Sequence, residues 1–440
     1  MRRGQVETPS DDTLRRARST MRSLVSDGAS TLPALSVVAD AIRLELERRG
    51  EVAILYVKLD RYGRLEPIFG WRIVHEILDA VAHNLGGMVG STLRRLDVVA
   101  DFTLTDDAFI VLLSPPRSGE PVSNDDLALV TRRVYERLQS LLLNDLQPGV
   151  YDRVHPSVGA AVLAADQSLT FEQNLQRGVA LAMQAAEEQA AVYQGELETT
   201  LAHCVEEGEL EPLFEPVVDL AARAAIGYRS SVRGPFYSPL RLPDVLLDVV
   251  RRSSLLSAYG VAARAATVQA AAGLEPDDML FVWCAAAELP NAAVVALSEF
   301  YSLNQALVPQ HVVFEIDADE LRTNTASTLR TLASVREMGF QLCLAGLGAQ
   351  FTTLELIAEA EPDYLCLDPV LVAGVTDQVT PLEVVQLLVR FADRVGAQLV
   401  ATGVREAAQE EVLRRSGVEL FCGELYARPD TRLPKVSLAR

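Results

Sequence analysis

The chain of 440 residues is long enough for two or three domains of ordinary size, and 49% of its residues are hydrophobic. Its 40 basic and 60 acidic residues leave a net charge of −20, which repels phosphate backbones and argues against a nucleic-acid polymer as a partner. The sequence shows neither an apolar run that could span a membrane nor the apolar stretch of a secretion signal. These features predict a folded cytoplasmic protein without a membrane span.

The cysteines are scattered along the chain and include no CxxC pair: Cys204, Cys284, Cys343, Cys366 and Cys422. Such spacing is not that of a zinc site or of a disulfide framework. We therefore expect reduced, mostly buried thiols and no bound metal.

The first half of the chain predicts helices that alternate with strands. Residues 1–30 are polar and rich in arginine, which indicates a short helical arm. Residues 31–190 form a predicted domain with helices near 32–49, 72–85, 125–143 and 171–194 and strands near 52–59, 101–113 and 157–163. Two strands around 101–113 are expected to form a hairpin. This order indicates an α/β sandwich with a mixed sheet.

The second half predicts a barrel. Residues 191–208 continue the preceding helix and are rich in Ala, Glu and Gln, so they form a predicted helical linker. Residues 209–432 then hold short apolar strands, mostly separated by helices, near 214–218, 226–232, 280–284, 312–316, 341–344, 364–367, 398–401 and 420–422. This pattern predicts a TIM-type (β/α) barrel with functional side chains at the carboxyl ends of its strands. Residues 433–440 are a C-terminal tail.

The first domain resembles the GGDEF domain of diguanylate cyclases through YVKLDRYGRLEPIFGW at 56–71, RRLDVVA at 94–100 and TDDAFIVLL at 105–113. The resemblance implies that Lys58 stands where a metal-binding Asp is expected. The turn that names the family reads 105–109 here and has lost both glycines, and Glu66 stands at the Asn position that reads guanine. A cation in place of a metal ligand leads us to expect no cyclase activity.

One feature of the cyclase family is retained, because Arg94 and Asp97 match its RxxD inhibitory site for cyclic di-GMP. Arginine reads guanine N7 and O6 or a phosphate with two bonds, and a carboxylate accepts from the guanine N1 and N2 protons. The alternative is a local Arg–Asp pair on a solvated helix end. Arg94 and Asp97 are the candidate ligand site of this half.

The second half resembles EAL domains, the cyclic di-GMP phosphodiesterases, through FEPVV at 214–218, GYRSSVR at 227–233, FEI at 314–316, PDYLCLD at 362–368, VATGV at 400–404 and GELYARP at 423–429. The resemblance implies that most metal-binding and catalytic positions are replaced, by Arg229, Trp283, Ala345, Cys366, Thr402, Arg405 and Cys422. Glu315 remains, and Asp368 also matches. Two carboxylates cannot hold two magnesium ions, so we expect no phosphodiesterase activity and no catalytic residue.

Ligand binding by the barrel depends on a second, weaker set of candidates, namely Arg229, Arg233 and Glu315. The resemblance assigns a phosphate contact to Arg233, and Arg229 adds a positive charge near it. Glu215 replaces a Gln of the first strand, which argues against the site. Trp283 either fills the pocket or stacks on a base, and filling is the commoner role of a buried indole.

These observations predict a catalytically inactive, degenerate GGDEF–EAL protein that acts in bacterial signalling as a cyclic di-GMP-responsive or scaffolding module through protein–protein interaction. A nucleotide-independent adaptor that only docks an unidentified signalling or structural partner is the alternative. A third reading, an enzyme with Cys366 as its nucleophile, lacks supporting groups. We expect cyclic di-GMP as the one ligand, and we expect no cofactor.

Dimerisation is a further hypothesis, because apolar residues recur at helical spacing between 171 and 208. Leu175, Val179, Ala182 and Ala186 could form the seam of a homodimer. The alternative, which we favour, is that this face packs on its own domain.

Overall fold

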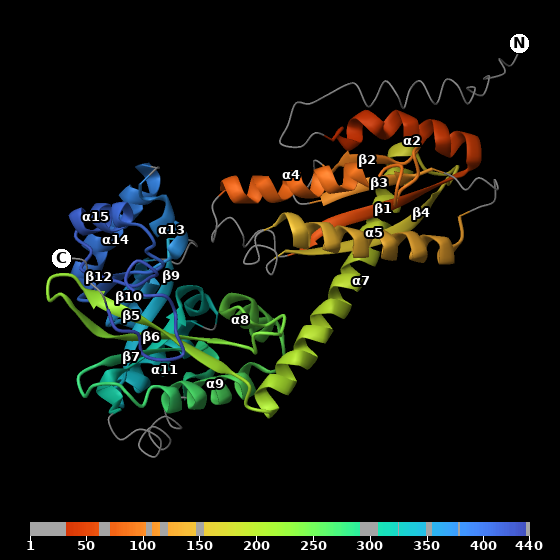
Figure 1. Ribbon diagram of the computed structural model, residues 1–440. Coiled ribbons are helices and arrows are strands. Elements are labelled where there is room, and N and C mark those ends of the chain that lie inside the picture. Colours follow the sequence, from red (N-terminus) through yellow and green to blue (C-terminus); the bar gives the residue numbers. More distant parts are fainter. Residues whose placement is uncertain are drawn as a thin grey trace, which may run out of the picture. The chain divides into compact units, whose positions relative to one another are not determined.

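The computed structural model describes residues 32–60, 71–102, 108–114, 122–146, 154–290, 307–323, 325–348, 354–376 and 379–436. The chain divides into two compact units, residues 1–195 and 196–440, and the boundary lies within the long helix α7 (Phe171–Glu206). Figure 1 shows the helices and strands of both units. The predicted arm at 1–30, Glu66 and residues 105–107 lie outside the described residues.

The first unit is built on a sheet of four strands, β1 (Glu51–Asp60), β2 (Val98–Asp101), β3 (Ala108–Leu113) and β4 (His155–Ala164), in the order β2-β3-β1-β4. Each neighbouring pair is antiparallel, so the prediction of a mixed sheet is wrong for the described strands. The hairpin explains the difference. It inserts β3 between β1 and β2, so strands that run in the same direction are never neighbours.

Helices cover both faces of this sheet. On one face, Leu55 and Val57 pack against helices α4 (Trp71–Gly87) and α5 (Asn124–Asp145). On the other face, Ile54 and Tyr56 pack against α2 (Leu35–Arg49) and α7. Because both faces of β1 are buried, its sequence is apolar almost throughout rather than alternating.

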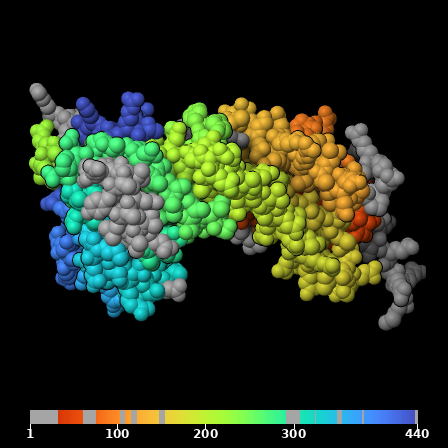
Figure 2. Space-filling view, turned by 90° about the horizontal axis from the view of Figure 1, so that it is seen from below, coloured from red at the N-terminus to blue at the C-terminus, as the bar shows by residue number. Residues whose placement is uncertain are grey.

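Helix α7 packs its small apolar face on this sheet. Val179, Ala182 and Ala186 are buried there, with Leu175 partly buried beside them. This face is the one considered as a dimer seam, and within its own unit it is already covered. Figure 2 shows that other parts of the α7 surface face solvent. The exposed side chains of this helix include Leu181 and Val192.

The second unit is a closed barrel of eight strands, as predicted, and the strand order is β10-β11-β12-β5-β6-β7-β8-β9. The strands are β5 (Glu211–Asp219), β6 (Ala224–Arg233), β7 (Met279–Trp283), β8 (Val312–Asp317), β9 (Gln341–Leu347), β10 (Tyr364–Leu367), β11 (Gln398–Ala401) and β12 (Leu420–Phe421). The first strand departs from a regular (β/α) barrel, because β5 is antiparallel to both β6 and β12. A tight turn joins β5 directly to β6 without a helix, and this reverses its direction.

Helices surround this barrel: α8 (Pro243–Arg252), α9 (Leu256–Ala270), α11 (Thr325–Glu337), α12 (Leu354–Ala360), α13 (Pro369–Gly374), α14 (Val379–Val395) and α15 (Ala407–Arg415). One apolar cluster fills the space between strands and helices, and a smaller one fills the lumen. Among the described helices, none is long and apolar enough to cross a lipid bilayer.

Candidate functional site in the barrel lumen

An ion pair joins two strands across the barrel interior. Arg229 on β6 donates from Nε to Glu315 Oε2 at 2.6 Å and from Nη2 to Glu315 Oε1 at 2.5 Å. The Glu315 side chain, on β8, is 5% exposed and that of Arg229 is 29% exposed. Two of the weaker candidate residues are therefore brought together, but they bind each other.

The opposite charges of Arg229 and Glu315 compensate each other where little water reaches them. Burial acts against the charged guanidinium, but the Glu315 carboxylate outweighs it and holds the pKa of Arg229 well above its usual value. A buried ion pair of this kind is stable only while both partners are present and hydrogen-bonded. Both carboxylate oxygens of Glu315 accept from Arg229, which leaves this carboxylate poorly available to another cation.

Thiols line the lumen beside the ion pair. Cys343 on β9 and Cys366 on β10 have their sulfur atoms 3.2 Å apart, and Cys422 follows β12. All three are buried. Burial raises the pKa of Cys343 and of Cys422 well above the ordinary value, so both remain neutral thiols at physiological pH. Cys366, the nucleophile of the enzymatic reading, lies buried among apolar side chains.

Two further carboxyl groups lie near the lumen. Burial raises the pKa of Glu215 on β5, an effect that the Arg229 charge opposes. Burial also raises the pKa of Asp368, whose Oδ1 accepts from the Val370 amide at 2.8 Å and caps helix α13. Asp368 thus has a structural role at the start of a helix.

Trp283 ends β7 in an aromatic and cationic surrounding. The Arg251 guanidinium lies 5.7 Å from the indole ring centre, and the Tyr259 ring is 6.3 Å away. Arg251 also pairs with Asp317 at the end of β8. The indole Nε1 is buried and has no hydrogen-bond partner among the residues that the structure describes. Trp283 is partly exposed, so whether it fills the pocket or stacks on a base stays a prediction.

Arg233, the expected phosphate contact, lies apart from the Arg229–Glu315 pair. It pairs with Glu211 on the neighbouring strand β5, Nε to Oε2 at 2.8 Å. The side chains are 29% and 47% exposed, so solvent screens this pair.

The candidate site of the first unit forms a tight local network. Asp97 is 3% exposed, and its Oδ1 accepts from the Ser114 amide and hydroxyl, each at 2.6 Å. Its Oδ2 accepts from the Arg94 amide at 2.7 Å, while the exposed Arg94 donates from Nη1 to the Ser114 carbonyl at 2.8 Å. These bonds tie the turn before β2 to the end of β3. Ligand binding at Arg94 and Asp97 stays a prediction.

Ser114 and Cys343 are among the residues of these sites that were not predicted from the sequence. Ser114, whose carbonyl accepts from Arg94 and whose amide and hydroxyl donate to Asp97, follows β3 and carries no motif. Cys343 lies two residues before Ala345 on β9, and alternation along a strand places both on the lumen side. The alternation of side chains along a strand could therefore have identified Cys343 as a lumen residue from the sequence.

The fold and the site define a β/α barrel protein with a buried Arg–Glu ion pair in its lumen. The EAL domain model matches residues 196–429, more than half of the chain. The chain belongs to the EAL domain family.

Curated relatives that match most of the chain include two cyclic di-GMP phosphodiesterases. It is 23% identical over 401 residues to the cyclic di-GMP phosphodiesterase NbdA of Pseudomonas aeruginosa, covering 86% of this chain and 48% of the relative. It is 23% identical over 461 residues to the cyclic di-GMP phosphodiesterase PdeR of Escherichia coli, covering 97% of this chain and 64% of the relative. The chain thus spans about half to two thirds of these relatives.

Among solved structures, the EAL enzyme Bd1971 in its cGMP-bound form superposes with a TM-score of 0.51 at 17% identity, over 62% of this chain and 78% of the other. At this level of identity, the similarity concerns the fold alone.

The family resemblance implies divalent metal ions, and the described lumen residues do not fit them. Magnesium requires several anionic oxygens arranged around it. Among the residues that the structure describes, no group of three or more His, Cys, Asp or Glu side chains is placed to hold a metal. Arg229 carries a positive charge directly against Glu315.

Proposed function

We propose that this chain is a catalytically inactive EAL protein that acts in bacterial signalling by binding, with its first unit derived from a GGDEF-like domain. The observation that carries the proposal is the pairing of Glu315 with Arg229 in the lumen, at 2.5 and 2.6 Å. A guanidinium in that position excludes a second cation by charge and by volume. The thiols and apolar residues around it cannot replace the missing oxygen ligands.

Two forms of this function remain, and they differ in the response to cyclic di-GMP. A cyclic di-GMP-responsive module would use Arg94 and Asp97, or Arg229 and Arg233. The alternative is a nucleotide-independent adaptor. It is favoured by the engagement of Asp97 with Ser114 and of Arg233 with Glu211, because a ligand would have to displace these bonds.

Hydrolysis and binding are tested separately. With purified protein and Mg²⁺ or Mn²⁺, we expect no linear dinucleotide from cyclic di-GMP; turnover that is lost in Glu315→Gln would contradict the proposal. Calorimetric titration without metal, with GTP as a control, then separates the two forms. Micromolar binding that Arg94→Ala abolishes and Arg233→Ala leaves intact establishes a sensor in the first unit. The reverse pattern places the site in the barrel, and the absence of both heat and a thermal shift at saturating ligand leaves the adaptor.

A further inference from the structure

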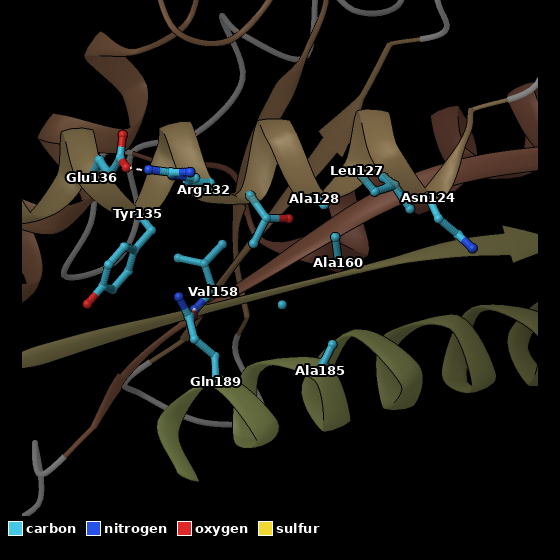
Figure 3. A pocket seen from close by; sticks show the side chains of 12 residues that line it. Asn124, Leu127, Ala128, Arg132, Tyr135, Glu136, Val158, Ala160, Ala185 and Gln189 are labelled. Carbon is cyan, nitrogen blue, oxygen red and sulfur yellow. Dashed lines mark hydrogen bonds and ion pairs between the residues drawn. The ribbon is translucent and has the colours of Figure 1, made fainter. Parts of the chain in front are cut away.

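A shallow groove of about 580 Å³ runs along β4 in the first unit, between helices α5 and α7 (Figure 3). Its floor is the strand at residues 158–160. One wall comes from α5 with Leu127, Thr131 and Tyr135, and the other comes from α7 with Ala185 and Gln189. Neither the ion pair of the barrel nor the network around Asp97 belongs to this groove.

The floor of the groove includes backbone groups on the outer edge of β4. The Val158 amide points away from β1 and donates to Gln189 Oε1 at 2.5 Å. Because backbone direction alternates along a strand, the amides and carbonyls of Ala160 and Val162 point the same way. Pro156, which has no N–H, occupies another of these outward positions, as is usual for an edge strand. Among the described strands, β4 pairs with β1 alone.

The two helices recess this edge. Helix α7 lies so close to β4 that a Cβ on Gly159 would be 2.1 Å from the Ala182 carbonyl oxygen. Helix α5 packs Leu127 and the ring of Tyr135 along the opposite wall. If a second copy of this chain paired its own β4 edge here, its flanking helices would meet α5 and α7 before the two β4 strands could touch. A single extended chain is slender enough to enter.

We propose that the outer edge of β4 binds an extended peptide segment of a partner protein as an additional strand. The outward groups of Ala160 and Val162 supply backbone hydrogen bonds to it. Alternate residues of the peptide contact the two walls, with apolar side chains toward Leu127 and Tyr135 and small side chains toward Ala185. The inference rests on the protein-binding part of the proposed function and names the kind of partner, but it involves no nucleotide.

The test uses the full chain and a displayed library of random peptides of ten residues, the length of β4. Selected peptides are measured by fluorescence anisotropy, without cyclic di-GMP. We expect them to slow hydrogen exchange in the segment that contains Ala160 and Val162. Ala160→Pro removes an outward donor while leaving the bonds to β1, and it should weaken binding about tenfold, the effect of one lost hydrogen bond.

A second variant guards against a folding defect. Ala128→Arg places a long side chain into the groove from the exposed surface of α5 and should also weaken binding at least about tenfold. Leu129→Arg adds the same charge one position along the helix, outside the groove lining, and should leave binding unchanged. Peptides that bind both groove variants as well as the unsubstituted protein, or a library without binders, overturn the proposal. A dimer in solution that Ala160→Pro dissociates overturns it in favour of a second copy. Loss of nucleotide binding alone leaves it standing.

Discussion

Arg229 and Glu315 come from strands separated by β7, and their side chains meet inside the barrel. The exposed fraction of Glu315 is only 5%, and the guanidinium satisfies both of its oxygens. A carboxylate in this place depends on its partner, because desolvation penalises a buried charge that has lost its counter-ion.

We expect Arg229→Met to lower the free energy of unfolding by about 3–5 kcal/mol, since it leaves Glu315 buried without a partner. Urea denaturation measures this loss. The matched control is Arg233→Met, which breaks the more exposed pair with Glu211 and should cost less than about 1 kcal/mol. The double variant Arg229→Met with Glu315→Leu should recover most of the loss. Equal losses in the two single variants would contradict this account.

Glu215 predicts a pH dependence of stability. Burial raises the pKa of its carboxyl, and the Arg229 charge only partly opposes the effect. The folded state therefore holds this proton more tightly than the unfolded state, so stability falls as the pH rises from the unfolded pKa to the folded one. We expect Glu215→Gln to be more stable than the unsubstituted protein at pH 7, with no difference below about pH 4.

Thermal unfolding across this pH range measures the effect of Glu215→Gln. The control is Glu211→Gln on the same strand, because that carboxyl is 47% exposed and pairs with Arg233. It should give no gain in stability at neutral pH. A gain in Glu215→Gln that is the same at every pH would show that the carboxyl charge is not its cause.

At the scale of elements, the contact between β4 and α7 depends on a glycine. A Cβ on Gly159 would lie 2.1 Å from the Ala182 carbonyl oxygen and 2.2 Å from the Ala186 amide nitrogen. Both atoms belong to the helix backbone and cannot turn aside as the end of a side chain would. The strand and the helix can be this close only because residue 159 has no side chain.

We expect Gly159→Ala to destabilise the first unit by about 1–3 kcal/mol or more, because helix α7 must move away from the added Cβ. This is the range typical of overpacking. Gly195→Ala on the same helix is the control, since a Cβ there meets nothing within 4 Å. It should stabilise the helix by up to about 1 kcal/mol. Chemical denaturation followed by far-UV circular dichroism measures both. An unchanged free energy of unfolding in Gly159→Ala would show that helix α7 adjusts at no cost.

At the scale of the whole molecule, the described cores do not cross the boundary between the units. The clusters on the two faces of the first sheet come from residues 32–186, and the two clusters of the barrel come from residues 214–436. Each unit thus has its own apolar core, which is the physical condition for independent folding.

We expect a fragment of residues 196–440 to unfold cooperatively in scanning calorimetry, near the temperature of one of two transitions of the full chain. The boundary cuts helix α7, so a fragment that begins at residue 171 provides the comparison. A fragment that shows no transition from either starting point would contradict the independence of the barrel core.

The amino-acid sequence predicted the barrel well, because its eight strands are short apolar runs with clear turn and helix signals between them. It predicted the elements of the first unit for the same reason. The sequence did not predict the direction of strand pairing in the first sheet. Local periodicity cannot tell whether β3 or β2 lies beside β1, and that choice decides between a mixed and an antiparallel sheet.

The sequence by itself determined the family, the two-part organisation and several of the residues that occupy the lumen positions, because these depend on order and local pattern. Only the tertiary structure decided what those residues do to one another. It joined Arg229 to Glu315, and Asp97 to Ser114. It also left the edge of β4 in a groove between two helices. Side chains distant in sequence meet only when strands are placed beside each other, and hydrogen bonds and charge depend on that distance.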